Sequence, residues 1–278
     1  GTWYVREIEQ PAGFVLDDTI YPVTIGADGQ VVEIEIVNKY VRGNIHLTKV
    51  DSEYPDNKLT GATFEVYRDS NANGKLDDGD ELLGTLTEKE KGDYSMNDLF
   101  YGRYFVKETK APEGFVLDTG VYEVMIDTNG KNYEVENKAG VGFINEAMRG
   151  NLKIVKTSSD GKVKGFAFRI TGANGYDIIL ETNDKGEIFI DGLRIGDYTI
   201  SEVSNSASSM YVLPADKKAT VKLGSTTIVE MHNVLRDTPK TGDTTNLPLL
   251  YALAGLSAVG IAVCGVIGFK KKKKEDRN

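Results

Sequence analysis

The sequence is poor in the side chains on which most catalytic and metal sites depend. Its 278 residues include one cysteine, Cys264, and two histidines, His46 and His232. A single cysteine cannot form a disulfide within the chain, and so few histidines argue against a zinc site or a histidine-based catalytic triad. No other grouping of residues suggests repeated turnover, so we do not expect an enzyme.

Positive charge is also scarce over most of the chain. Six of the 33 basic residues and three of the 42 acidic residues lie beyond Thr241. Up to that residue, 27 basic residues therefore stand against 39 acidic ones, a net charge of −12. Nucleic-acid binding requires a basic face, so the composition argues against a nucleic-acid partner.

One long apolar run lies near the C-terminus. Leu247 to Phe269 contains 23 residues without a charge. As a helix it would span roughly 34 Å, compared with about 30 Å for the hydrocarbon core of a bilayer. Five lysines follow at once, and such a basic cluster stays on the cytoplasmic side. We predict a single transmembrane helix over 247–269, a basic cytoplasmic tail over 270–278 and an extracellular body.

A short motif precedes this helix. Residues 236–246 contain Thr238, Pro239, Lys240, Thr241 and Gly242 in succession. Motif, apolar helix and basic tail together resemble the Leu-Pro-x-Thr-Gly-type sorting signal of Gram-positive surface proteins, although threonine replaces the usual leucine, which leaves the class of sortase open. The resemblance implies that a sortase cleaves after Thr241. It then passes the threonine carboxyl to an amine of a peptidoglycan precursor or of another pilin. The alternative is a plain membrane anchor.

The rest of the chain contains internal repeats. WYVREIEQPAGFVLD at 3–17 recurs as YFVKETKAPEGFVLD at 104–118. VNKYVRGNIHLTK at 37–49 recurs as INEAMRGNLKIVK at 144–156. Self-similarity at a spacing of this size indicates tandem structural units.

A third, more diverged copy completes the pattern. It carries GDYTISEV at 196–203 and MHNV at 231–234. We therefore predict two complete units, over 43–147 and 148–235. Residues 1–42 match only the C-terminal part of a unit, so we expect its first strands to lie upstream in a longer protein.

Each complete unit has the pattern of a β-sandwich. Apolar residues alternate with polar ones in runs such as Phe64–Val66, Tyr122–Ile126 and Leu152–Ile154, and turn pairs such as Asn129–Gly130 separate the runs. No stretch before Leu247 keeps a helical period. Several short strands in about 100 residues favour two packed sheets.

Strand alternation directs three polar side chains of each complete unit into the apolar interior, since residues i, i+2 and i+4 share a face. These are the lysines Lys49 and Lys156, the glutamates Glu108 and Glu202, and the asparagines Asn145 and Asn233. The incomplete unit has Glu7 and Asn38 at the matching positions. Glu7 follows Trp3 and Val5, and Asn38 follows Ile34 and Ile36, so we expect inward-facing strands there as well. An alternative is that each residue sits at a strand end, where alternation no longer implies burial. The same trio in the same order in two units argues against coincidence.

Amide formation would remove the cost of burying these groups. Burial lowers the pKa of Lys49 towards a neutral amine and raises the pKa of Glu108. A protonated Glu108 would donate a hydrogen bond to the side-chain carbonyl of Asn145 and shuttle protons. Attack on that carbonyl expels ammonia and leaves an isopeptide bond between the first and last strands. Such a bond restrains the unfolded chain as a disulfide does.

Three segments resemble Cna protein B-type domains, which have the SpaA-like prealbumin fold. They are TKVD at 48–51, LTGATFEVY at 59–67 and YFVKETKAPEGF at 104–115. The resemblance implies an all-β architecture of tandem prealbumin/Ig-like β-sandwich domains ahead of the transmembrane helix. That family builds stalks and pili on Gram-positive bacteria, and many members cross-link themselves through such a Lys–Glu–Asn trio. The trio of the last unit would be Lys156, Glu202 and Asn233, and the lysine partner of Asn38 would lie upstream.

One loop matches the spacing of a calcium-binding EF-hand loop over residues 69–80. Oxygen donors stand at positions 1, 3, 5, 9 and 12, the carbonyl of residue 75 takes position 7, and glycine takes position 6. The candidate ligands are Asp69, Asn71, Asn73, Lys75, Asp77 and Asp80. Such a site would hold a structural calcium ion, and we expect no other cofactor. The alternative is an acidic, solvated turn.

The sequence supports two hypotheses of function. The first is a structural stalk or pilus-type subunit, covalently anchored to the cell wall of a Gram-positive bacterium and stiffened by isopeptide bonds. The alternative is an adhesin whose domains bind a host surface or matrix protein directly. No aromatic cluster or unusual loop in residues 1–241 favours the second.

Overall fold

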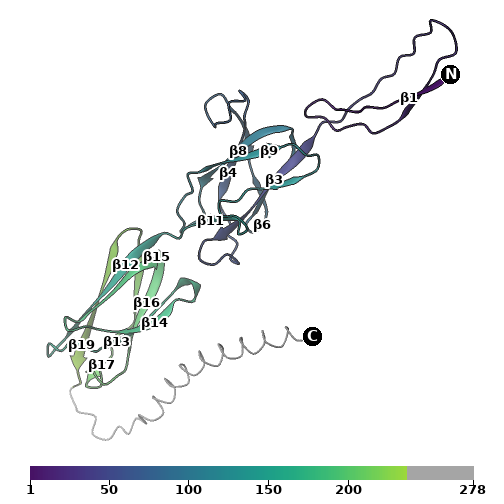
Figure 1. The fold of residues 1–278 in the computed structure, drawn as a ribbon. Helices are drawn as coiled ribbons and strands as arrows, with labels where there is room; N and C mark the ends of the chain where they lie inside the picture. The colour runs from purple at the N-terminus through teal and green to yellow at the C-terminus, as the bar shows by residue number, and fades with distance from the viewer. Residues whose placement is uncertain (237–278) are drawn as a thin grey trace, which may run out of the picture.

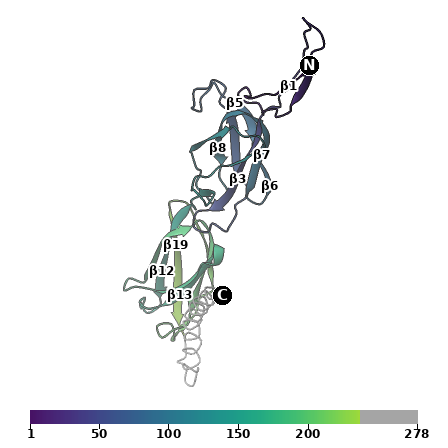
Figure 2. The ribbon, with the colours of Figure 1, turned by 45° about the vertical axis from the view of Figure 1, so that its right-hand side comes forward.

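The computed structural model describes residues 1–236, which form three parts in a row along an elongated chain (Figures 1 and 2). Within these residues the secondary structure is β, apart from a three-residue 3-10 helix, η1 (Ala173–Gly175). The expected all-β fold is therefore confirmed. None of the described helical segments is long and apolar enough to cross a membrane. The predicted sorting motif, transmembrane helix and basic tail lie outside the described residues.

The first sandwich runs from β3 to β11 and consists of two facing sheets. One sheet has the order β10 (Asn132–Glu134), β3 (Arg42–Asp51), β7 (Asp93–Phe100), β6 (Thr87–Glu90), with β11 (Phe143–Asn145) paired to the far end of β3. The other has the order β5 (Glu81–Thr85), β4 (Thr63–Arg68), β8 (Gly102–Lys110), β9 (Val121–Ile126). The last strands, β10 and β11, run parallel to the first strand, β3.

The second sandwich runs from β12 to β19 and repeats this plan. One sheet has the order β15 (Glu187–Arg194), β12 (Arg149–Ser158), β19 (Thr226–Leu235), β17 (Tyr211–Val212). The other has the order β14 (Asp177–Glu181), β13 (Ala167–Gly172), β16 (Gly196–Val203), β18 (Lys217–Val221). Here the last strand, β19, is one continuous strand parallel to β12.

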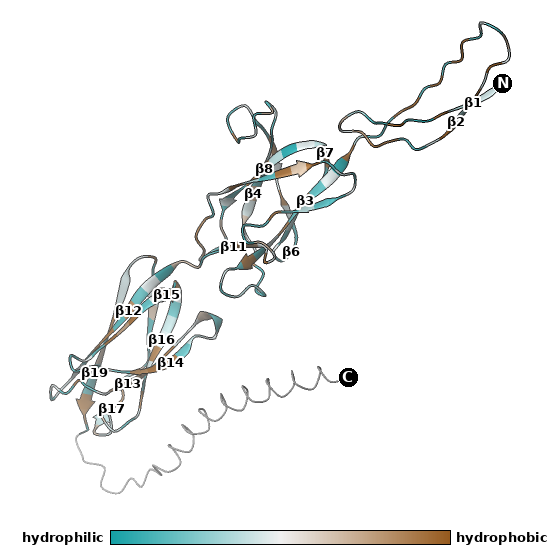
Figure 3. Ribbon diagram, in the orientation of Figure 1, coloured by the Kyte–Doolittle hydropathy of each residue, from teal (hydrophilic) through white to brown (hydrophobic). Residues whose placement is uncertain are grey.

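Each sandwich encloses its own hydrophobic core between its two sheets, and brown apolar segments alternate with teal polar ones along the strands (Figure 3). In β3, Ile45 and Leu47 are completely buried, while His46 between them is partly exposed. Leu152 and Ile154 of β12 behave in the same way. Burying one such side chain contributes roughly 1.5–3 kcal/mol, so the alternation fixes which face of each strand points inward.

Residues 1–41 form a much smaller structure. Within this N-terminal segment β1 (Thr2–Val5) pairs with β2 (Tyr21–Thr24), and no other strand forms. The alternation around Ile34 and Ile36 had suggested a further strand, which is wrong for this structure. A strand needs a neighbour that accepts its backbone hydrogen bonds, and none lies beside residues 34–38. Trp3, expected to face an interior, is 64% exposed because, among the described residues, no second sheet packs against β1 and β2.

The chain passes between these parts through the same backbone pattern at both joints. One residue at each joint, Val41 at the first and Met148 at the second, makes two backbone hydrogen bonds. Its N–H donates to a loop of the preceding part, and its C=O accepts an N–H of the following part. The partners are Gly13 and Tyr101 for Val41, and Gly114 and Ile195 for Met148, at 2.8 and 3.0 Å in both cases. The joints are therefore hydrogen-bonded on both sides rather than free linkers.

Candidate functional site

The parallel pairing of β11 with β3 brings Lys49 and Asn145 together in the first sandwich. Lys49 lies opposite Phe143 and Asn145 lies two residues further along β11, so both side chains enter the core from neighbouring strands of one sheet. Glu108 enters from β8 of the facing sheet, where it lies opposite Phe64. The three side chains are almost completely buried, at 0% exposure for Lys49 and Glu108 and 3% for Asn145.

Direct contacts join the three groups. Lys49 Nζ donates to the carbonyl of Phe143 at 3.0 Å and to Asn145 Oδ1. Glu108 Oε1 lies 4.0 Å from Lys49 Nζ. Asn145 Nδ2 donates to Glu108 Oε2 at 2.8 Å and to the carbonyl of Val116 at 2.7 Å. The amine, the amide and the carboxyl group that isopeptide formation requires therefore lie within contact distance.

Burial shifts the ionisation of both titratable groups towards their neutral forms. Desolvation lowers the pKa of Lys49 to about 8, against the opposing attraction of Glu108, Asp118 and Asp51. Desolvation also raises the pKa of Glu108, although hydrogen bonds from the backbone of Asp118 and from Asn145 oppose this shift. Near neutral pH, a neutral amine thus costs far less here than it would in water.

The orientation of the Asn145 amide differs from the sequence expectation. We expected Glu108 to face the carbonyl oxygen, but it faces Nδ2 instead. The carbonyl of Val116 can only accept a hydrogen bond, so it selects the NH₂ end of the amide at that position. Glu108 therefore lies beside the nitrogen that would leave as ammonia, where it can deliver a proton.

The second sandwich repeats the arrangement with one difference. Asn233 Nδ2 donates to Glu202 Oε1 at 2.7 Å, and Lys156 lies opposite Met231, two residues before Asn233 on the parallel strand. Lys156 Nζ, however, donates to the carbonyl of Thr157 and lies 4.0 Å from the ring centre of Phe166. Burial lowers the pKa of Lys156 and raises the pKa of Glu202.

Two buried atoms of this second site lack a partner. Within residues 1–236, Glu202 Oε2 and Asn233 Oδ1 are buried without a hydrogen bond. Leaving buried acceptors unpaired costs roughly 1–3 kcal/mol each. A change of rotamer that turned Lys156 towards Asn233 would satisfy one of them and give the contact that Lys49 already makes.

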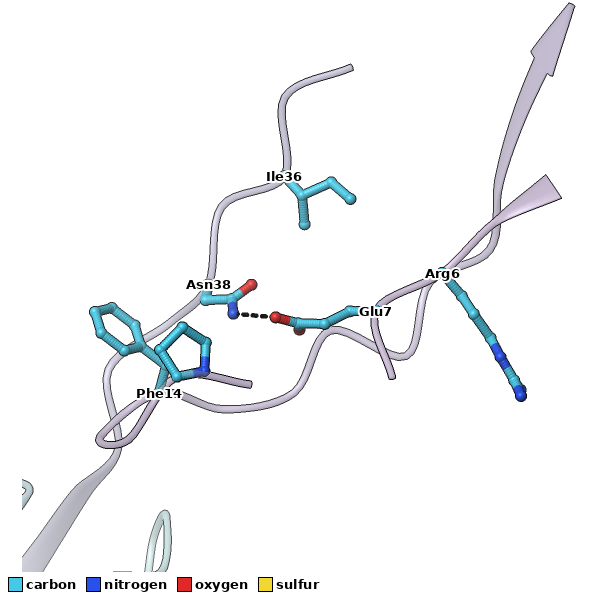
Figure 4. Close-up of a pocket in the computed structure, with 6 residues that line it drawn as sticks. Arg6, Glu7, Phe14, Ile36 and Asn38 are labelled. Carbon is cyan, nitrogen blue, oxygen red and sulfur yellow. Dashed lines mark hydrogen bonds between the residues drawn. The ribbon is translucent and has the colours of Figure 1, made fainter. Parts of the chain in front are cut away.

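The N-terminal segment keeps the carboxyl and amide groups of this site. In Figure 4, Glu7 and Asn38 face one another, with Asn38 Nδ2 donating to Glu7 Oε1 at 2.6 Å. The backbone N–H of Asp17 donates to Glu7 Oε2 at 2.8 Å. Asp118 makes the same contact with Glu108 in the first sandwich, also at 2.8 Å.

The sequence reasoning missed a second layer around the first site. Asp118 Oδ2 accepts from Asn137 Nδ2 at 2.7 Å and from the hydroxyl of Tyr122 at 2.9 Å. Although burial opposes it, hydrogen bonds from Asn137, Gly120 and Tyr122 lower the pKa of Asp118. The repetition of GFVLD, which ends at Asp17 and again at Asp118, was a signal that could have identified this aspartate. Asn137 gave no such signal.

The predicted calcium loop connects β4 to β5 and is held by hydrogen bonds between its own residues. Asp69 accepts the backbone N–H groups of Asn73 and Gly74 at 3.2 and 3.1 Å, and Gly74 has φ of +75°, as the sixth position of such a loop requires. Asp80 likewise accepts the N–H of Asp77 at 3.0 Å. Among the described residues no three His, Cys, Asp or Glu side chains gather as a metal site. Calcium binding stays a prediction.

The fold agrees with what comparison with known proteins finds. A family model described as the SpaA prealbumin-like fold domain matches residues 1–40, 43–139 and 150–234. The chain therefore belongs to the family of SpaA prealbumin-like fold domains, which confirms the resemblance noted in the sequence.

Two relatives are similar to this chain at 26% identity. One is the trypsin-resistant surface T6 protein of Streptococcus pyogenes serotype M6, aligned over 194 residues, 59% of this chain and 34% of that protein. The other is the solved structure of the Bacillus anthracis TIE protein, with a TM-score of 0.65, covering 84% of this chain and 42% of that one. The chain thus spans less than half the length of either relative.

Proposed function

We propose that this chain is a structural subunit of a Gram-positive cell-surface stalk or pilus, stiffened by a Lys–Asn isopeptide bond in each sandwich. The observation that carries the proposal is the contact of Lys49, Glu108 and Asn145 in a buried core. A buried, unpaired charge is costly. Because both sandwiches bury the same polar trio at this cost, we infer that the trio serves a function other than packing.

The proposed reaction is a transfer of the Asn145 acyl group from ammonia to lysine. Neutral Lys49 Nζ attacks Cγ of Asn145, and a C–N bond forms as the bond between Cγ and Nδ2 breaks. Glu108 takes up a proton that Nζ sheds and delivers one to Nδ2, which leaves as ammonia. Glu108 is unchanged overall, and each trio reacts once, so the chain has no turnover.

The relatives support this reading in two ways. The T6 protein is, as its name states, a surface protein that resists trypsin. A domain whose first and last strands are covalently joined opens less readily, and proteolysis depends on such opening. The match to a family of prealbumin-like fold domains is also consistent with a structural role.

The mass of the protein tests the proposal directly. We expect residues 1–236, produced in a host that lacks sortase, to be lighter than calculated by the mass of two ammonia molecules. Glu108→Ala and Glu202→Ala should each regain one ammonia mass, because each removes the proton relay of one site. A parent protein at its full calculated mass would overturn the cross-linking proposal.

Attachment to the cell wall is the second part of the proposed function. Sortase would join Thr241 to an amine of a peptidoglycan precursor or of another pilin, after the transmembrane helix had held the chain at the membrane. In a Gram-positive host with sortase, we expect detergent to leave the protein in the wall fraction. Pro239→Ala should shift it to the membrane fraction, since it disrupts the extended motif. A wall fraction unchanged by this substitution would contradict sortase anchoring.

A further inference from the structure

The strand that carries Asn145 is short and supported on one side by β3. Strand β11 has three residues. The carbonyls of Phe143 and Asn145 accept hydrogen bonds from Lys49 Nζ and from Ser52 N–H, on the β3 side. The backbone groups of Ile144, between them, point the other way. In a longer sheet a further strand would bind them.

The side chain of Asn137 takes the place of that strand. Its Oδ1 accepts the N–H of Ile144 at 2.6 Å, and its Nδ2 donates to the carbonyl of Ile144 at 2.8 Å. One amide thus satisfies both backbone groups of the residue next to Asn145. This fixes the position of β11 both along and across the sheet.

The same amide is also linked to the carboxyl group of the site. Asn137 Nδ2 donates to Asp118 Oδ2 at 2.7 Å, and the backbone N–H of Asp118 donates to Glu108 Oε2 at 2.8 Å. Glu108 Oε2 in turn accepts from Asn145 Nδ2 at 2.8 Å. The hydrogen bonds therefore close a ring that runs from Glu108 through Asp118, Asn137 and β11 back to Asn145.

In the second sandwich, the strand that carries the asparagine is held by strand pairing instead of by such a ring. Its asparagine, Asn233, lies in β19, a strand of ten residues. That strand pairs with β12 at eight positions and with β17 on its other side. Pairing with β12 up to Asn233, and with β17 at Val234 and Leu235 directly after it, holds this strand without a bridging side chain such as that of Asn137.

We propose that Asn137 is a positioning residue for the isopeptide bond of the first sandwich, acting by holding Asn145 Cγ against Lys49 Nζ and Glu108 beside the leaving nitrogen. The inference rests on the proposed function, because it presupposes that the bond forms. Misplacing reacting groups by about 1 Å can cost a hundredfold in rate, and two hydrogen bonds on β11 would be lost. Asn137→Ala should therefore slow formation of the Lys49–Asn145 bond by about tenfold to a hundredfold.

The test follows both bonds in the same molecules. The full chain is made by cell-free synthesis in detergent, samples are quenched at intervals, and the two cross-linked peptides are quantified by mass spectrometry. We expect Asn137→Ala to slow the Lys49–Asn145 bond and to leave the Lys156–Asn233 bond at its parental rate. The matched control is Asn132→Ala, an exposed asparagine of the same edge whose side chain bonds to Asn44 instead, and it should change neither rate.

The possible results separate the positioning role from the proposed function. A parental rate for Asn137→Ala, or equal slowing of both bonds, would overturn the positioning role. No bond in the parent chain would instead overturn the proposed function on which it rests. If Asn137→Ala leaves the first sandwich unfolded, Asn137→Asp keeps the acceptor for Ile144 N–H and loses the donor. That variant should fold and react slowly, and a folded Asn137→Asp chain with the parental rate would equally overturn the role.

Discussion

Glu108→Gln should lower the melting temperature of the first sandwich by about 20–30 °C. The substitution keeps the size of the buried side chain but cannot relay protons, so the bond between Lys49 and Asn145 should not form. That bond closes a loop with a sequence separation of 96 residues, and a cross-link of this span stabilises a fold by about 4–5 kcal/mol. For a domain of about 100 residues, each kcal/mol shifts the melting temperature by roughly 4–8 °C.

Calorimetry of residues 1–236 measures this effect with an internal control. The two sandwiches have separate cores, so their transitions can be followed in one protein. Glu108→Gln should move the transition of the first sandwich alone, and Glu202→Gln should move the second. Lys49→Met removes the bond by a different route and should give a similar shift. A loss below about 5 °C in both Glu108→Gln and Lys49→Met would show that the bond contributes little.

The chemistry of the site could be predicted from sequence because it depends on strand alternation. Lys49, Glu108 and Asn145 continue the inward-facing sets of their strands, and the structure buries all three. Alternation carries no information about side-chain rotamers. It therefore predicted neither the orientation of the Asn145 amide nor the placement of Lys156 Nζ against Phe166.

The residues that sequence reasoning missed lie outside the periodic segments. Asn137 stands between β10 and β11 and binds backbone atoms that sequence does not place beside it. Such loop contacts can be predicted only when the three-dimensional arrangement of the strands is known. The expected strand around Ile34 failed for a related reason, since alternation predicts a strand only where a partner strand exists.

A third buried charge of the first sandwich, Asp51, belongs to the joint between the sandwiches. Its side chain is completely buried and lies two residues beyond Lys49 on β3. Arg194 of the second sandwich binds both its oxygens, at 2.7 and 2.8 Å, and also donates to Glu53 at 2.7 Å. Hydrogen bonding to Asp51 raises the pKa of Arg194, against the effect of burial. Arg149, the first residue of β12, pairs with the same Glu53.

Arg194→Ala should therefore destabilise the first sandwich, although the substituted residue lies in the second. Removing one partner of a buried pair costs about 3–5 kcal/mol, because the other charge stays buried. The matched control is Arg169→Ala, which breaks an exposed pair with Asp177 inside the second sandwich and should cost no more than about 1 kcal/mol. Urea unfolding measures both, and small-angle scattering should show a loosened joint in Arg194→Ala only.

The double variant Asp51→Asn with Arg194→Leu completes the test. With the buried charges removed together, most of the lost stability should return, whereas the joint should stay loose because the Arg194 contacts with Asp51 and Glu53 are gone. Equal effects of Arg194→Ala and Arg169→Ala would contradict the role of Asp51 as a buried anchor. For the proposed stalk, this puts two fastenings in one place. Asp51, which binds Arg194 of the second sandwich, lies two residues along β3 from Lys49, so the joint contact and the proposed Lys49–Asn145 bond lie at the same end of that strand.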